Sequence, residues 1–455
     1  MTTPEPVEPA GAPATGRASG EASLVRAMGV AALTAGIVNV TIGGGIFRLP
    51  AGAADALGAA APLAYLVCAA AMALIVLCFA EAGSRVSLTG GLYAYVEVAF
   101  GPLLGFLTGI FLWASMTSAL AAVATFFADS LAALLPALEG ATARGLVIAL
   151  VIGGLAGLNV LGVRGASRFN TAMTVAKLLP LLLLVVLGVG AVRGEHLAWD
   201  AAPGADRLAG ASAFLIFAFL GVESALVPSG EVRDPARTVP RALFLAMGVV
   251  TLVYVAVHLV AQGILGPALA GQRTPLAEAA GVAMGGWGRT LVLVGSAISM
   301  FGYVSGMTLG VPRQLYAFAR DGFLPAVLAR VHPAWRTPHW AIVAQAVVTI
   351  ALALSGGFER LALLANGAGL VAYAACCAAS WELRRRNVQS GGTPFRLPAA
   401  GVVPVLALAI IAWLLTGISR AEWAAMGVAL VAALALYGIA RARGLRGAAA
   451  ARADR

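Results

Sequence analysis

The sequence predicts an all-α membrane protein with twelve transmembrane helices, and three observations lead to that prediction. Of the 455 residues, 60% are hydrophobic and 11% are charged, and the mean hydropathy is +0.92. A soluble globular domain is about half apolar and about one quarter charged, and disordered chains are less apolar still. Long apolar runs recur, each long enough for a span of about 20 residues. Two of these runs are interrupted by glycine beside polar residues.

The apolar runs divide the chain into a central membrane domain, residues 25–440, and two tails. The predicted spans lie at about 26–52, 60–84, 101–136, 144–162, 166–192, 208–229, 240–265, 289–318, 338–356, 359–382, 402–418 and 422–440. Two short segments, Tyr93–Phe100 and Thr274–Met284, are expected to lie at the membrane surface between spans. Residues 1–24 are expected to form a disordered cytoplasmic tail, because they lack the apolar core of a secretory signal. Residues 441–455 are expected to form a basic cytoplasmic tail.

The arginines orient this array. With the N-terminus inside, 21 arginines fall on the inner side and 8 on the outer side. Inner loops of membrane proteins carry the excess of basic residues, so both termini are expected in the cytoplasm of a multi-pass protein of the cell membrane. The net charge of +10 is then mostly a bias toward anionic headgroups of the inner leaflet, and no nucleic acid partner is expected.

Residues that support enzymatic or metal chemistry are scattered. The four histidines share no motif, and no His-x-x-Glu-His or Gly-x-Ser-x-Gly run exists. No catalytic residue, cofactor or metal site is therefore expected. Buried thiols rather than a disulfide framework are expected from the cysteines, which all lie within apolar runs: Cys68, Cys78, Cys376 and Cys377.

The interruptions lie in spans 1 and 6. Span 1 contains three consecutive glycines within Asn39–Phe47, and span 6 contains Gly221 and Glu223 within Phe217–Ser224. Irregular backbone at membrane depth must be buried in protein or line a cavity. A close helix crossing at the glycines is the alternative. Because spans 1 and 6 each begin a set of five, matching breaks predict an inverted-repeat secondary transporter with its site near the midplane.

Four motifs in order resemble the amino acid–polyamine–organocation family, which has the LeuT-type fold. They are Gly43–Phe47, Phe219–Ser224, Glu231–Arg241 and the pair Arg320–Pro325 with Thr337–Pro338. The resemblance implies a 5+5 inverted repeat with broken helices 1 and 6. Repeat one covers about 25–193 and repeat two about 207–386, and two extra C-terminal helices, the eleventh and twelfth, cover about 402–440.

The resemblance implies a substrate site between broken helices 1 and 6, and helix polarity there suits a zwitterionic amino acid. Free amides near Gly44–Phe47 suit a carboxylate, and carbonyls near Phe217–Leu220 suit an ammonium group. The resemblance implies a substrate pocket formed by Val40, Thr41, Gly43, Gly44, Gly45, Met116, Phe217, Phe219, Leu220 and Met307. These residues are small or apolar, which favours a neutral amino acid over arginine or agmatine.

Lys177 is the only lysine, and it lies in span 5 about 18 Å from either end. A charged group at this depth marks a functional site, and lysine releases its proton more readily than arginine. Two hypotheses stay open: Lys177 couples transport to protons, or it clamps carbonyls freed by the break in span 1. Glu223 is the second candidate for proton coupling. Three other intramembrane groups are expected to be interfacial or helix-pairing groups rather than site residues: Glu81, Asp129 and His258.

These features together predict a permease that moves amino acids and protons by alternating access without sodium. An exchanger of the same fold is the alternative within this class. A channel or a membrane enzyme is the alternative from another class, and the paired breaks favour a transporter over both.

Overall fold

The computed structural model describes residues 29–86, 91–161, 166–199, 201–223, 232, 235–389, 394–395, 399 and 401–453. All the elements that these residues form are helices. The expected tail at residues 1–24 lies outside this part of the chain. Of the Glu231–Arg241 motif, the structure describes Val232 and the residues from Pro235 onward.

Ten helices build the bulk of the molecule. They are α3 (Ala61–Arg85), α5 (Pro102–Leu134), α6 (Ala141–Leu161), α7 (Ala166–Gly188), α9 (Pro235–Leu265), α10 (Pro275–Gly310), α12 (His339–Ser355), α13 (Phe358–Arg385), α14 (Val403–Thr416) and α15 (Arg420–Ala453). Seven described helical stretches are long and apolar enough to cross a membrane. Proline stands at the start of several of them, where its missing N–H removes no helical hydrogen bond.

The helices at both predicted breaks are interrupted. The first is divided into α1 (Val30–Thr41) and α2 (Gly45–Leu57). The second runs as α8 (Ala205–Leu215), continues as the 3₁₀ turn η5 (Ile216–Phe219), and then turns at Gly221. The φ angle of Gly221 is +103°, a conformation that favours glycine.

Short helices occur where the sequence predicts surface segments. Residues Leu92–Phe100 form α4, close to the predicted Tyr93–Phe100. Residues 275–284 form a separate first part of α10, because Gly285 has φ +75° and breaks the helix there. One predicted span was too long. The helix of span 8 ends at Gly310, and Pro312 begins the short helix α11 (Pro312–Arg320).

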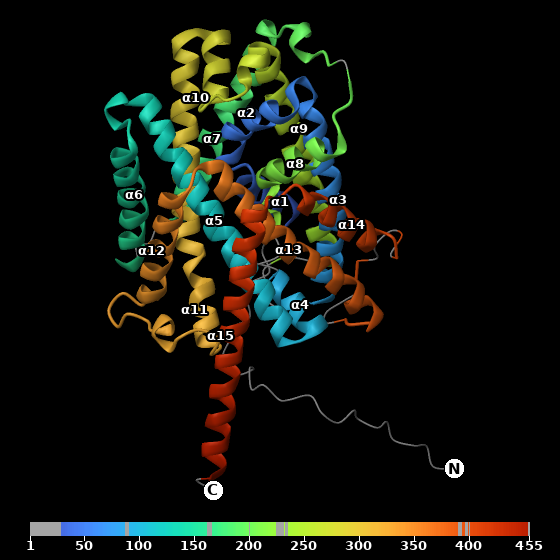
Figure 1. Ribbon diagram of the computed structural model, residues 1–455, viewed down its shortest axis with the longest axis vertical. Helices are drawn as coiled ribbons and strands as arrows, with labels where there is room; N and C mark the ends of the chain where they lie inside the picture. The colour runs from blue at the N-terminus through green and yellow to red at the C-terminus, as the bar shows by residue number, and fades with distance from the viewer. Residues whose placement is uncertain are drawn as a thin grey trace.

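The bundle has a buried centre and an exposed periphery. Helix α5 packs along α13, and α9 packs along both α1 and α3. Helices α6 and α12 lie outside α5, and α15 runs along the outside of the bundle (Figure 1). Helices α4 and α11 lie at the end toward which α15 extends, which we call the C-terminal end (Figure 1). Helix α15 continues through the segment expected to be a basic tail and reaches Ala453.

Candidate functional site

The first break redirects the hydrogen bonds of its own backbone. In a continuous helix Gly43 would donate to the carbonyl of Asn39, four residues earlier. Instead the Gly43 amide donates to the carbonyl of Thr41 at 2.8 Å. The amine of Lys177, on α7, donates to the Asn39 carbonyl. The side chain of Lys177 is buried, so this contact lies inside the bundle.

The start of α2 presents amides that have no acceptor within the helix. Gly44 is its N-cap residue, and the amides of Gly44, Gly45 and Ile46 belong to its first turn. The N-terminus of a helix carries a partial positive charge, which favours an anion. Glycine keeps this turn close to its neighbours. A Cβ at Gly45 would lie 3.0 Å from the ring of Phe217.

The second break is held from α13. The amide of Asn366 donates to the carbonyls of Ala213 at 2.7 Å and Phe214 at 3.1 Å, in the last turn of α8. These carbonyls lie at the helix end, where backbone partners run out. Asn366 is fully buried and adds a side-chain donor from α13 to the carbonyls at the end of α8.

Glu223 organises the turn that follows. Its Oε2 accepts the amide of Gly221 at 2.9 Å and the hydroxyl of Tyr373 at 2.5 Å. Tyr373 lies on α13, so Glu223 ties the turn after η5 to that helix. The side chain is buried, and both donors contact the same oxygen of its carboxylate.

Tyr254 connects the two breaks. Its hydroxyl, on α9, lies 2.9 Å from the carbonyl of Thr41 and 2.8 Å from the carbonyl of Ala218. Thr41 ends α1, and Ala218 belongs to η5. A movement of either break therefore changes the hydrogen bonds of the same phenol.

A small cavity of about 20 Å³ lies between the breaks. It has room for about one water molecule. Its lining comes from both breaks, α5 and α10: Val40, Thr41, Gly43, Gly44, Gly45, Ala119, Val123, Phe217, Ala218, Leu220 and Tyr303. None of these described lining residues carries a charged side chain. The cavity therefore suits a ligand whose charges are met by backbone groups.

Most of the residues predicted for the pocket line this cavity. They are Val40, Thr41, Gly43, Gly44, Gly45, Phe217 and Leu220. Phe219, Met307 and Met116 lie outside the lining. Phe219 is fully buried and packs edge-on against Tyr254, with 5.5 Å between ring centroids. Lys177 and Glu223 hold the backbone of the breaks and do not line the cavity either.

Four lining residues were missed by the sequence analysis: Ala119, Val123, Ala218 and Tyr303. Tyr303 lies one turn before the predicted Met307 on α10, and Ala119 lies about one turn after the predicted Met116 on α5. The cavity thus takes its lining from the two helices that carry the predicted residues, about one turn away from them. Tyr254 and Asn366 were also missed, since single polar residues within apolar runs give no periodic signal.

A larger cavity of about 610 Å³ opens at the end of the bundle opposite the C-terminal end. Its lining includes Arg48, Asp129, Arg144, Arg273 and Glu359. Two ion pairs cross it: Arg48–Glu359 at 2.6 Å and Arg144–Asp129 at 3.1 Å. We call it the vestibule.

One aromatic contact joins the lining of the vestibule to that of the central cavity. Phe358 lines the vestibule, and Phe217 lines the central cavity. The two rings meet edge to face, with 5.4 Å between their centroids. Both side chains are buried, so this contact lies inside the bundle between residues that line the two spaces.

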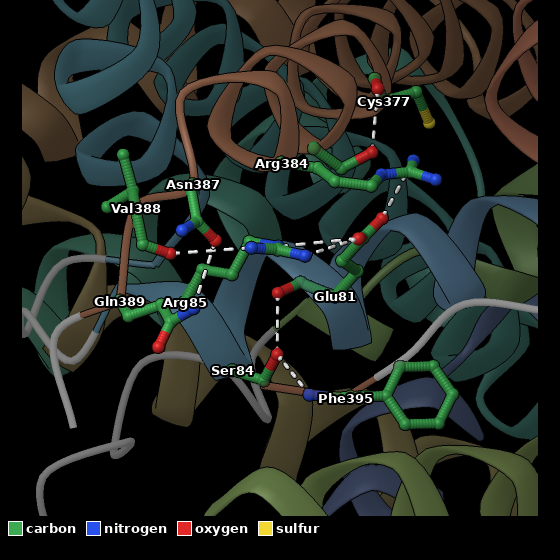
Figure 2. A network of polar contacts seen from close by, with 10 residues as sticks. Glu81, Ser84, Arg85, Cys377, Arg384, Asn387, Val388, Gln389 and Phe395 are labelled. Atoms are coloured by element: carbon green, nitrogen blue, oxygen red, sulfur yellow. Dashed lines mark hydrogen bonds and ion pairs between the residues drawn. The ribbon is translucent and has the colours of Figure 1, made fainter. Parts of the chain in front are cut away.

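An ionic network joins α3 to α13 near the C-terminal end. Figure 2 shows Glu81 between two arginines, with Oε1 3.1 Å from Arg85 and Oε2 3.0 Å from Arg384. Arg85 also donates to the carbonyl of Val388 at 3.4 Å. Glu81 is 1% exposed, so this predicted helix-pairing group is a buried one. Asp129 has the same role with Arg144.

The part of the chain that the structure describes holds no group of three or more His, Cys, Asp or Glu side chains placed to bind a metal ion. The four cysteines are buried and free. The chemistry that the site offers is therefore recognition by backbone amides and carbonyls, with polar contacts that hold the two breaks.

Comparison with known proteins matches this arrangement to transporters. The family described as "Amino acid permease" matches residues 28–438. The branched-chain amino acid permease of Bacillus subtilis (strain 168) is 27% identical over 436 residues, covering 92% of this chain and 94% of that protein. From the same organism, the methylthioribose transporter is 28% identical over 88% of this chain and 90% of its own length. The serine/threonine exchanger is 27% identical over 82% and 86%.

Proposed function

Because the chain belongs to the amino acid permease family, we propose that it carries neutral, apolar amino acids across the membrane by alternating access. The family and the relatives above are transporters rather than enzymes, and the chain is a multi-pass membrane protein of amino acid transport. We propose the substrate, the coupling ion and the orientation of the chain in the membrane.

The observation that carries the proposal is the cavity between the two breaks. The first turn of α2 offers amides to a carboxylate, and η5 offers carbonyls to an ammonium group. The side chains around the cavity include Val40, Val123 and Leu220. A cationic side chain would find no acidic partner among the described lining residues, and burial of an unpaired charge is costly.

An amino acid is larger than the cavity, so side chains must move to admit it. Phe217 is the candidate for this movement, because it lines the cavity and its ring contacts Phe358 of the vestibule. We propose that its movement away from Phe358 opens the site toward the vestibule. Release to the opposite side would require movement of α1, which Lys177 and Tyr254 hold.

The proposed architecture has twelve spans. Repeat one covers about 25–193, repeat two about 207–386, and the last two helices about 402–440, with a LeuT-type 5+5 relation between the repeats. The breaks at the start of each set support this arrangement. The C-terminal end of the bundle is proposed to face the cytoplasm across the cell membrane, near anionic headgroups, because the excess of arginine lies on that side.

Proton coupling without sodium is proposed from Lys177. Its amine already occupies the Asn39 carbonyl at the first break, where a sodium ion would need free oxygen ligands. Glu223 is the second candidate. Amino acid exchange on the same scaffold is the alternative mode of transport.

The similarity to the methylthioribose transporter brings a second candidate substrate. A cavity whose described lining residues include no charged side chain also suits an uncharged thiosugar. The two candidates differ at the amides of α2, since only an amino acid brings a carboxylate to them.

Uptake into proteoliposomes tests the proposal and separates these candidates. Labelled leucine, alanine, serine, arginine and methylthioribose are compared in sodium-free buffer, with and without a pH gradient. We expect uptake of neutral amino acids and little uptake of arginine. Uptake of methylthioribose alone would replace the proposed substrate class, and strong uptake of arginine without leucine, alanine or serine would contradict it.

A further inference from the structure

His258 is an ionisable residue without a described polar partner in the C-terminal half of α9. The side chain is fully buried, and neither ring nitrogen has a hydrogen-bond partner in the described structure. Buried polar groups are nearly always satisfied, and an ionisable residue within the membrane marks a functional site. From the sequence, His258 is expected to be an interfacial or helix-pairing group, but the ring is fully buried and reaches no polar partner in the described structure.

A second unsatisfied group contacts the ring, and a third lies on a neighbouring helix. Tyr65, on α3, packs against it with 5.1 Å between ring centroids, and the Tyr65 hydroxyl is also without a described partner. The thiol of Cys68, one turn along α3, donates to the carbonyl of Ser212 at 3.2 Å. The hydroxyl of Ser212 has no described partner. Three unsatisfied side chains thus lie on α3 and on the two helices that pack against it, α8 and α9.

This group of residues lies one helical turn from the breaks. Tyr254 and His258 are four residues apart on α9 and therefore lie on one face of it. Tyr65 also packs against Tyr254, with 6.4 Å between centroids. The Tyr254 hydroxyl contacts the carbonyls of both breaks. We call Tyr65, Cys68, Ser212, Tyr254 and His258 the His258 cluster.

We propose that His258 binds a proton during the transport cycle and that Tyr65 and Tyr254 link this proton to the two breaks. The inference rests on the proposed function and extends its coupling beyond Lys177. Histidine is the side chain whose ordinary titration lies between pH 5 and 8. A charged ring has no described acceptor in the present packing. A proton on His258 therefore favours an arrangement in which α3 and α9 admit water to the ring.

The other titratable groups near α9 are each accounted for by their position or their partners, so the proton is assigned to His258. Those of the His258 cluster itself are Tyr65, Cys68 and Tyr254, and Lys177 on α7 binds the Asn39 carbonyl. Helix α1 contributes none in its described residues. The remaining titratable groups on α9 and on described elements packed against it lie at surfaces, in ion pairs, in the central cavity or, for Cys78, buried farther along α3: Arg48, Asp55, Cys78, Glu81, Arg85, Glu195, His196, Arg237, Arg241, Glu278, Arg289 and Tyr303.

The first test replaces His258 with a side chain that does not titrate. His258→Gln keeps a polar amide in a similar volume. In proteoliposomes we expect pH-driven accumulation of leucine to fall at least about tenfold, the effect of about one pKa unit of coupling. Counterflow exchange should stay within about twofold, because the cavity is untouched. Ser130→Ala is the control, since Ser130 is buried and without a described partner but does not titrate.

The second test uses Cys68 as a native reporter of water access to the cluster. Alkylation by N-ethylmaleimide is mapped to individual cysteines by peptide mass spectrometry at about pH 5.5 and about pH 7.5, on either side of histidine titration. At each pH, the alkylation rate of a cysteine in the parent is divided by its rate in His258→Gln. This ratio cancels the intrinsic pH dependence of thiol reactivity, because both proteins carry the same thiol. We expect that ratio for Cys68 to rise at the lower pH, and not for Cys376.

Three results would overturn the inference. They are an unchanged pH profile of uptake in His258→Gln, loss of counterflow together with accumulation, and a Cys68 ratio that does not change with pH. Failure of the proposed function looks different. The parent protein would then show no counterflow of any neutral amino acid, while the Cys68 ratio would still report on His258.

Discussion

The amine of Lys177 donates a hydrogen bond to the backbone carbonyl of Asn39, the carbonyl that Gly43 would bind in an unbroken helix. The only lysine of the chain thus holds the last turn of α1 from α7. The contact supports the clamp hypothesis directly. It also places a group that can release a proton on the segment whose movement would open the site.

Exchange of Lys177 for arginine separates the two roles. Arginine keeps a donor for the Asn39 carbonyl and keeps its charge at all relevant pH values. We expect Lys177→Arg to retain counterflow exchange and to lose pH-driven accumulation. Lys177→Ala should lose accumulation and also lower the free energy of unfolding by about 1–3 kcal/mol, because a buried carbonyl loses its donor. Uptake against pH in sodium-free buffer is the measurement. A parent-like pH profile in Lys177→Arg would leave only the clamp role for Lys177 and make His258 and Glu223 the remaining candidates for proton coupling.

Gly45 sets the distance between α2 and the ring of Phe217. A Cβ there would lie 3.0 Å from Phe217 and 3.3 Å from Leu49, so Gly45→Ala should push Phe217 away from α2. We expect weaker binding of leucine in a competition assay on purified protein. Gly36→Ala is the control, because nothing lies within 4 Å of its added Cβ. Equal affinities in both variants would mean that the position of Phe217 does not matter for binding.

The ion pair Arg48–Glu359 joins α2 to α13 across the vestibule. Arg48 also donates to the carbonyl of Gln272 at 3.1 Å, so one guanidinium joins α2, α13 and the segment before α10. Glu359 is half exposed, and an exposed pair contributes at most about 1 kcal/mol, or about fivefold in a conformational equilibrium. Glu359→Gln should therefore speed labelling of a cysteine introduced at Ala119 by up to about fivefold. Glu278→Gln, which breaks the Arg289 pair instead, should leave that rate unchanged.

The buried ion pairs of Glu81 should contribute more to the stability of the fold than ion pairs with exposed partners. Removal of one partner from a buried ion pair costs about 3–5 kcal/mol. Glu81→Gln leaves Arg85 and Arg384 without their shared carboxylate, so we expect a lower midpoint of thermal unfolding in detergent. Glu382→Gln is the control, because its partners are exposed and such pairs contribute about 1 kcal/mol or less. Equal midpoints in the two variants would contradict the importance of the network.

The sequence predicted the features that follow from composition and from glycine. Three consecutive glycines at Gly43–Gly45 indicated the first break, and Gly221 beside Glu223 indicated the second. Both breaks are present in the structure. The pocket residues near the breaks were also predictable, since Val40 and Phe217 lie within the interrupted segments themselves.

Residues that act across helices were not predictable in the same way. Tyr254 and Asn366 bind break carbonyls from α9 and α13, and each is one polar residue within a long apolar run. Their roles depend on how the helices pack, which hydrophobic periodicity does not determine for a helix that is apolar on all sides. For the same reason α10 contributes Tyr303 to the cavity where Met307 was expected, one turn away on the helix.

The central claim is that an amino acid binds between the breaks with its carboxylate on the amides of α2. Competition by leucine, leucine methyl ester and methylthioribose for labelled leucine on the purified protein tests it most directly, with Gly44→Leu as the variant that covers the amides. We expect leucine to compete, the ester to bind at least about tenfold more weakly for the loss of a charge-assisted contact, and Gly44→Leu to lose binding. Equal competition by leucine and its ester, with unchanged affinity in Gly44→Leu, would contradict the account.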